Sequence, residues 1–243
     1  MLTKVEIGNR VETISSNTFA SCRFLASVII PRGITSIGNY VFSNCYSLKS
    51  IIIPSGTTSI GTTVFNNCYS LASVTIPNSV TSIDNYAFTN CSSLTSVTIQ
   101  SGATATSIGS SAFNGCFCLA SVTIPNSVTS IGANAFYGCG GLESVIIPSG
   151  TTSIDGSVFY NCYSLVRVTM PSSLTSIGAN AFYGCSWMAV YDFSACTSVP
   201  TLVNTNAFGS IPSDCKILIP TSLYNTWSTA DKWSTYASYM VSV

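Results

Sequence analysis

The chain has 243 residues, and only 7% of them are charged, with eight basic and eight acidic side chains that cancel to a formal net charge of zero. So few charges cannot build the basic face that nucleic acid requires, so no nucleic-acid partner is expected. No apolar run approaches the roughly 18–20 residues of a bilayer span, so membrane insertion is not expected either.

The N-terminal segment predicts an exposed first strand. Residues 5–8 align with later strands of the chain, but Glu6 stands where those strands carry Thr or Ile, and Lys4, Arg10 and Glu12 add further charge. Residues 1–4 lack the charged-then-apolar layout of a signal peptide. The residues alone therefore leave the location open between the cytoplasm and a processed or partial secreted chain.

Phenylalanine and cysteine recur at a fixed period, which is the main signal in this sequence. Every step is 23 residues except at one place, from Phe88 to Phe113 and from Cys91 to Cys116, where it is 25, so two residues are inserted within 100–105. Because both series stay in phase on either side, we expect the insertion to form a surface loop. The series are Phe19, Phe42, Phe65, Phe88, Phe113, Phe136, Phe159 and Phe182, and Cys22, Cys45, Cys68, Cys91, Cys116, Cys139, Cys162 and Cys185.

One copy of the repeat, residues 71–91, predicts the local structure of all of them. Residues 74–76 alternate apolar, polar and apolar, which indicates a short half-buried strand, and Pro77 ends it. Residues 81–83 predict a second short extended piece, followed by a Gly or Asp turn. Residues 85–88 are too few for a helix and predict a single 3₁₀ or helical turn.

Stacking of the repeats predicts a solenoid. A single copy cannot bury its apolar faces alone, whereas stacked copies share one core and pair their strands into a continuous parallel ladder. Identical residues then align in columns inside the stack. We predict a repeat domain at residues 1–190, with eight 23-residue repeats, and a degenerate last repeat with a C-terminal cap at residues 191–243.

The C-terminal segment predicts the cap. The pattern decays after Met188, and Phe208 arrives late in the period. A final strand is expected at residues 216–219, ending at Pro220. Residues 221–239 place Leu223 and Trp227 at helical spacing, which predicts a short helical lid on the open end of the core.

The repeat motif resembles the BspA-like branch of the leucine-rich repeat family. The matching pattern is Leu-x-x-Val-x-Ile-Pro-x-x-Val-x-x-Ile-Gly-x-x-Ala-Phe-x-x-Cys, read at Leu71–Cys91 and Leu119–Cys139. The resemblance implies an α/β leucine-rich-repeat solenoid, a right-handed superhelix of short parallel strands with second short strands, 3₁₀ turns and a helical C-terminal cap. It also implies a secreted or surface-attached bacterial protein that acts in adhesion, and hence an extracellular or cell-surface location.

The eleven cysteines are expected to be free thiols for the most part. Eight of them share one column beside Phe, where they serve as small buried hydrophobes. A Cys196–Cys215 disulfide in the cap is an alternative, as is a ligand role for the pair Cys116 and Cys118. No His is present and no pair of Cys-x₂-Cys motifs occurs, so no zinc site, and no metal or cofactor, is expected.

No catalytic constellation is predicted. The absence of histidine removes Ser-His and Cys-His chemistry. Asp84 and Asp155 occupy the same turn position, but three repeats apart, or about 14 Å at strand spacing, so they are read as turn formers. We therefore expect a protein that is not an enzyme.

The candidate binding residues lie on the outward side of the first strands, where one column of serine and one column of threonine and isoleucine are expected to form a neutral surface of hydroxyl and methyl groups. Arg167 breaks the serine column, and tyrosines near the cysteine turn are candidate hot spots. Small β-forming residues on a solvated strand are the alternative interpretation. The candidates are Ser73, Thr75, Ser96, Thr98, Ser121, Thr123, Ser144, Arg167, Thr169, Tyr137 and Tyr160.

Two functions follow from these patterns. The first is a monomeric interaction module that binds a protein or glycan through the extended solenoid face. The second is a passive structural spacer with no ligand of its own, which the near-uniform columns favour.

Overall fold

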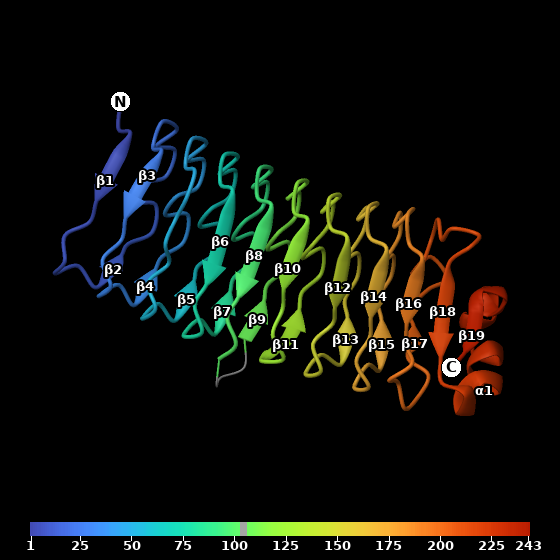
Figure 1. Cartoon of the computed structure of the whole chain (residues 1–243). Helices are drawn as coiled ribbons and strands as arrows, with labels where there is room; N and C mark the ends of the chain where they lie inside the picture. The colour runs from blue at the N-terminus through green and yellow to red at the C-terminus, as the bar shows by residue number, and fades with distance from the viewer. Residues whose placement is uncertain (103–105) are drawn as a thin grey trace.

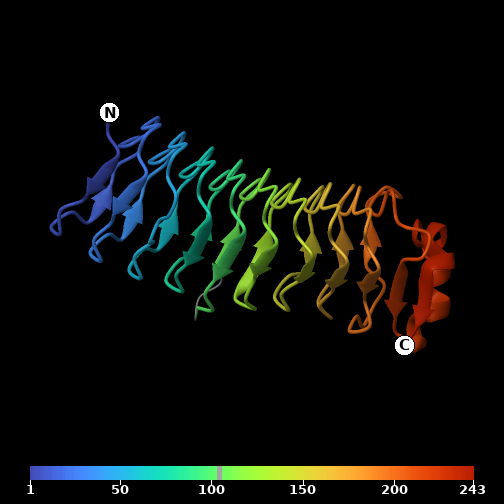
Figure 2. The same cartoon turned by 45° about the horizontal axis from the view of Figure 1, so that its top comes forward.

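The computed structural model describes residues 1–102 and 106–243 as one elongated solenoid of about ten turns (Figure 1). The N-terminus lies at one end and a helical cap lies at the other, and Figure 2 shows the turns stacked side by side along the whole length. Residues 103–105, part of the predicted insertion loop, lie outside the described residues.

Each turn contributes up to two short strands, which form two rows along the solenoid. The first-strand row holds β1 (Lys4–Glu6), β3 (Ser27–Ile29), β6 (Ser73–Ile76), β8 (Ser96–Ile99), β10 (Ser121–Thr123), β12 (Ser144–Ile146), β14 (Arg167–Thr169), β16 (Val190–Asp192) and β18 (Lys216–Ile219). The second-strand row holds β2 (Thr13–Ile14), β4 (Ser36–Ile37), β5 (Ser59–Ile60), β7 (Ser82–Ile83), β9 (Thr106–Ile108), β11 (Val128–Ile131), β13 (Ser153–Ile154), β15 (Ser176–Ile177) and β17 (Thr201–Leu202).

All pairing is parallel and keeps equivalent repeat positions opposite each other. Ser73 pairs with Ser96, and Ser96 in turn pairs with Ser121. The same holds in the second-strand row, where Ile60 lies opposite Ile83. The predicted parallel-strand solenoid is therefore confirmed.

The ladder is not continuous, which corrects the expectation from the sequence. In the first-strand row, residues 51–53 form no strand, and no pairing joins β10 to β12. In the second-strand row, no pairing joins β11 to β13. Both rows are thus interrupted between the same two turns, where Val122 and Ile124 are only half-buried. Other contacts along the stack hold these turns together, so a turn can lose its strand pairing without leaving the solenoid.

The phenylalanine column supplies one of those contacts. Its rings stack from Phe19 to Phe182 and on to Phe208, with neighbouring centroids 5.0–5.6 Å apart and nearly parallel planes. This spacing suits offset stacking. Every ring beyond Phe19 is fully buried, so Phe208 completes the column despite its late place in the sequence.

The cysteine column runs beside these rings, and all eleven cysteines are free thiols. From Cys45 to Cys185, each column thiol donates to the carbonyl of a phenylalanine in the preceding turn, at 3.2–3.3 Å. Burial raises the pKa of these thiols, to about 12 for Cys116. In the cap, Cys196 and Cys215 are buried but unbridged, so the alternative disulfide does not form here.

The turn around each phenylalanine is only in part the predicted 3₁₀ or helical turn, since Ala87, Thr89 and Cys91 donate to carbonyls three residues back but the N–H groups between them do not. Tyr86 and Asn90 adopt left-handed backbone angles, both with φ 59°, on either side of Phe88. These residues aim alternate N–H groups at the next turn, where Tyr86, Phe88 and Asn90 donate to the carbonyls of Ser110, Ala112 and Asn114. A 3₁₀ turn would direct those donors back into its own segment, which explains why this geometry replaces it.

The C-terminal cap is helical, as predicted. It contains η1 (Thr221–Leu223), α1 (Tyr224–Thr229) and η2 (Trp233–Tyr239), followed by β19 (Met240–Ser242), which pairs with β18. Trp227 and Trp233 are fully buried, and the Trp233 indole donates to the carbonyl of Pro200 at 2.6 Å. The predicted boundary at residue 190 falls inside β16, and the degenerate repeat beyond it continues both strand rows.

Candidate binding surface

The two predicted hydroxyl columns lie on the exposed side of the first-strand row. Ser73, Ser96 and Ser121 stand opposite one another across β6, β8 and β10, and Thr75, Thr98 and Thr123 form the neighbouring column. The threonines are exposed, and the valines between the columns point into the core, except that Val122 is half-buried. Alternation along each strand therefore presents every second side chain to solvent.

A groove opens at one end of these columns, where residues 51–53 form no strand. It has a volume of about 710 Å³ and is lined by Ser73 and Thr75 together with Arg32, Ile52 and Gln100. Ile52 is 81% exposed and points out of the row. The structure thus places two predicted residues at a hollow that sequence reasoning did not anticipate.

A second groove, of about 680 Å³, contains two further predicted residues, Ser144 and Arg167. At one repeat position, three successive turns carry Gly141, Ser164 and Trp187. The side chain at this position therefore becomes larger from one turn to the next and is an indole in the last of them. Trp187 also lines this groove, and it is 69% exposed.

Arg167 is held in place by an ion pair with Asp192 on the adjacent strand β16. Burial alone would raise the pKa of the Asp192 carboxyl, but hydrogen bonds from Ser194 and the charge of Arg167 outweigh it and hold that pKa below its ordinary value. Asp192 is therefore ionised at neutral pH and neutralises the arginine. Thr169, the other predicted binding residue on β14, is half-buried, whereas Arg167 is exposed.

The predicted tyrosines are not part of this surface. Tyr137 and Tyr160 lie in the phenylalanine turns and stack with centroids 4.8 Å apart, and Tyr160 stacks in turn on Tyr183 at 5.0 Å. All three are half-buried, and neither groove of the strand row includes them. The candidate residues therefore divide into an exposed strand surface and a separate tyrosine stack.

Sequence reasoning missed Trp187, Val166 and Glu143. Val166 lines the second groove and also a neighbouring hollow of about 350 Å³ on the other side of Trp187. Each of the three departs from the small residues usual at its repeat position, as Arg167 does. Ranking all such departures, instead of the column members, would have found them.

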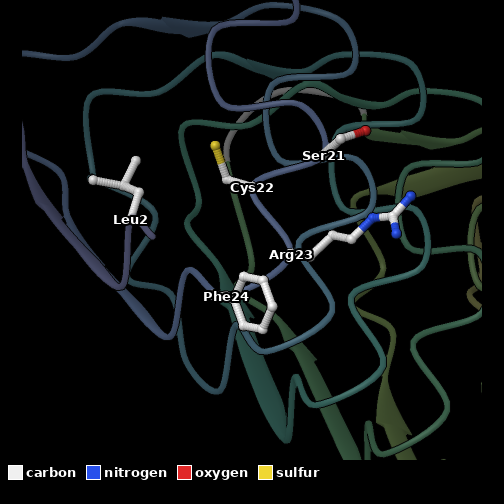
Figure 3. A pocket seen from close by; sticks show the side chains of 5 residues that line it. All are labelled: Leu2, Ser21, Cys22, Arg23 and Phe24. Atoms are coloured by element: carbon white, nitrogen blue, oxygen red, sulfur yellow. The ribbon is translucent and has the colours of Figure 1, made fainter.

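A small pocket of about 220 Å³ lies at the N-terminal end of the solenoid (Figure 3). Leu2, Cys22, Arg23 and Phe24 line it, and none of these is a predicted binding residue. The Arg23 guanidinium lies 5.5 Å from the ring centroid of Tyr46 in the next turn. The pocket contains no arrangement of polar groups that converge on a ligand.

Within residues 1–102 and 106–243, no three His, Cys, Asp or Glu side chains gather so that they could hold a metal ion. None of the described helices combines the length and hydropathy needed to cross a bilayer.

Comparison with known proteins identifies the repeat. A family model described as the BspA type leucine rich repeat region matches residues 1–106 and 94–211 in 6 copies. A leucine rich repeat protein of T. pallidum is 26% identical, with a TM-score of 0.57 over 77% of this chain and 78% of that one. A leucine rich cell surface protein of Faecalibacterium prausnitzii A2-165 is also 26% identical, with a TM-score of 0.53 over 90% and 82%. The pneumococcal vaccine antigen PcpA shares the fold at 17% identity, with a TM-score of 0.57 over 99% and 66%. No curated protein matches the chain.

Proposed function

This chain belongs to the BspA-type leucine-rich repeat family, and on that premise we propose that it is a non-enzymatic interaction module that binds a protein or glycan through its first-strand row. The observation that carries the proposal is the pair of exposed hydroxyl columns on β6, β8 and β10, which end at the groove beside residues 51–53. Solenoids commonly use such extended surfaces for binding.

The charge distribution favours short-range contacts over most of this surface. Between Lys49 and Glu143 the sequence contains a single charged residue, Asp84. Hydroxyl and methyl groups then make the contacts, and these are screened little by salt. Binding through the central turns is expected to persist at high ionic strength.

The proposed location is the bacterial surface or the secreted space. The F. prausnitzii relative is described as a leucine rich cell surface protein, and the T. pallidum relative is described as a leucine rich repeat protein. Antibody labelling of intact cells, compared with lysed cells, tests this proposal. Labelling that requires lysis would contradict it.

Arrays of immobilised proteins and glycans test the binding proposal. The variant Thr98→Glu/Thr123→Glu places two charges on adjacent strands of the exposed column and should abolish binding. The control Thr129→Glu/Thr152→Glu places the same charges on exposed residues of two adjacent turns at the second-strand row. Binding that the first pair leaves intact, or that both pairs reduce equally, would contradict the role of the first-strand row.

A passive spacer is the second candidate, favoured by the uniformity of the columns from β6 to β10. A spacer needs length and no particular surface. The spacer hypothesis predicts that the protein binds no ligand on either array. It also predicts that a longer protein containing this chain keeps its full activity when exposed residues of the first-strand row are substituted. Retention of one ligand on an array would exclude it.

A further inference from the structure

Four departures from the repeat, Glu143, Val166, Arg167 and Trp187, lie on neighbouring turns toward the C-terminal end of the solenoid. The position two residues after the column cysteine is serine in four of the eight turns, at Ser47, Ser70, Ser93 and Ser164, but it is tryptophan at Trp187. Near Trp187, Arg167 interrupts the serine column and Val166 is an exposed apolar residue. Maintenance of the solenoid requires none of these changes, because other turns stack without them.

Backbone pairing fixes how these residues lie. Val166 donates to the carbonyl of Glu143 at 2.8 Å, and Ala189 donates to the carbonyl of Val166 at 2.9 Å, so the three form one column. Trp187 donates to the carbonyl of Tyr163 at 3.1 Å in the adjacent column. The indole stands between two hollows, and Val166 lines both of them.

Each hollow contains a carboxylate. Glu143 lines the larger one and Asp214 lines the smaller one. Across residues 1–102 and 106–243, the ion pairs are Arg167–Asp192 and Lys232–Asp231, so neither of these two carboxylates has a cationic partner within the part described. Lys216 is exposed on β18 opposite Val190 and makes no ion pair among the described residues, whereas Arg167 is already neutralised by Asp192.

We propose that Trp187 anchors a basic side chain of a protein partner, with the lysine ammonium or arginine guanidinium over the indole and the carboxylates of Glu143 and Asp214 on its two sides. Tryptophan is the aromatic side chain that binds cations best, and flanking carboxylates strengthen the attraction. This inference rests on the proposed function and specifies the chemistry of the partner.

The charges around Trp187 favour a basic segment over two other classes of partner, a neutral sugar and an acidic segment. A neutral sugar could also stack on the indole, but it would gain no electrostatic attraction from the unpaired carboxylates. An acidic segment would be repelled by both of them. A basic segment alone uses the ring and both charges together.

Tryptophan fluorescence provides a direct test on the intact chain. Of the three tryptophans, Trp187 is exposed, whereas Trp227 and Trp233 are 0% and 1% exposed. A short peptide of alternating lysine and glycine should therefore change the exposed-indole emission, and added salt should weaken the effect. The same peptide with acetylated lysines should not change it. Quenching by the acetylated peptide, or by cellohexaose and not by the lysine peptide, would overturn the proposal.

Variants give a second readout through the anisotropy of the labelled lysine peptide. Trp187→Ala should weaken binding by about 5- to 30-fold, and Glu143→Gln or Asp214→Asn by about two- to fivefold each. The control is Phe24→Ala, since Phe24 is an exposed aromatic residue at the same repeat position near the N-terminus. Equal affinity of Trp187→Ala and Phe24→Ala would overturn the assignment.

The arrays separate failure of this inference from failure of the proposed function. If the unmodified protein binds an array ligand and Trp187→Ala binds it equally, the anchor is wrong while the binding function stands. If the unmodified protein binds no array ligand, the function fails, and the peptide titration still decides whether Trp187 captures a cation.

Discussion

Replacement of Phe136 by alanine tests how the two halves of the solenoid are joined. Phe136 lies at the boundary where neither strand row is paired, between β10 and β12 and between β11 and β13. Its ring stacks at 5.3 Å on Phe113 and at 5.5 Å on Phe159 across that boundary. The other described links there include the thiol of Cys162, the Tyr137–Tyr160 stack and backbone bonds between the turns.

The expected cost follows from burial. Phe136 is fully buried, and a Phe→Ala change at such a site costs about 3–5 kcal/mol of unfolding free energy. Phe88 is the matched control, because it is equally buried and stacks at 5.0 and 5.2 Å on its neighbours. Strand pairing of β6 with β8 and of β8 with β10 remains around Phe88 after its removal. Phe136→Ala is therefore expected to uncouple the halves, whereas Phe88→Ala only lowers the stability of one block.

Urea unfolding with two probes distinguishes these outcomes. Far-UV circular dichroism reports the whole chain, while all three tryptophans lie within residues 187–233 and report the C-terminal half alone. The two midpoints should coincide for the unmodified protein and for Phe88→Ala, and they should separate for Phe136→Ala. Coincident midpoints for Phe136→Ala would refute the reasoning that the interrupted rows make this boundary weak.

Three further predictions concern single sites. Thr63 has φ 61° despite its branched side chain, whereas three equivalent positions carry asparagine, which tolerates this left-handed conformation better. Thr63→Asn should therefore raise the unfolding free energy by about 1 kcal/mol, measured by urea titration. A loss of stability would contradict this. Arg167→Gln should cost about 0.5–1 kcal/mol at pH 7, because the pKa of Asp192 is lowered in the folded state, and the cost should shrink as the pH falls below about 4; a cost independent of pH would argue against the ion pair. Burial raises the pKa of Cys116 from 9.0 to about 12, so the unfolded chain loses this proton first and stability should fall as the pH rises through that range. With Ellman's reagent at pH 8, exposed Cys118 should react first, and rapid reaction of the buried column would contradict the packing.

Much of the fold could be predicted because a repeat multiplies a weak local signal. The alternation at residues 74–76 would be ambiguous alone, but its recurrence beside Phe and Cys fixed the strands, the stacked rings and the buried thiols. The lid at residues 221–239 followed from the spacing of its apolar residues. The strand β19 beyond it was missed, because residues 240–242 gain their partner only once the lid has folded back onto β18.

Features that depend on three-dimensional neighbours could not be predicted in this way. The left-handed residue Tyr86 occupies a position that other turns fill with asparagine, serine or threonine, and this mixture does not by itself reveal the backbone angle. The position of Asn90 is asparagine or glycine in seven of the eight turns, which was a signal for left-handed backbone that the strand-and-turn pattern passed over. The gap at residues 51–53 lies within a run of isoleucines that strongly favours a strand. The prominence of Trp187 depends on Gly141 and Ser164 in the preceding turns, and a search for regular columns passes over such exceptions.

The thiol-to-carbonyl bonds also determine how this architecture can change in length. In each turn the column cysteine donates to a phenylalanine carbonyl of the preceding turn, and the phenylalanine carbonyl accepts from the cysteine of the following turn. The same contact therefore joins every pair of neighbouring turns. Whole 23-residue units can be duplicated or deleted without leaving an unmatched group, whereas a partial unit would put the thiol donors and the carbonyl acceptors out of register. We therefore expect a chain with one whole unit added or removed to keep the fold, because the stack fixes the period of the repeat and not the number of copies.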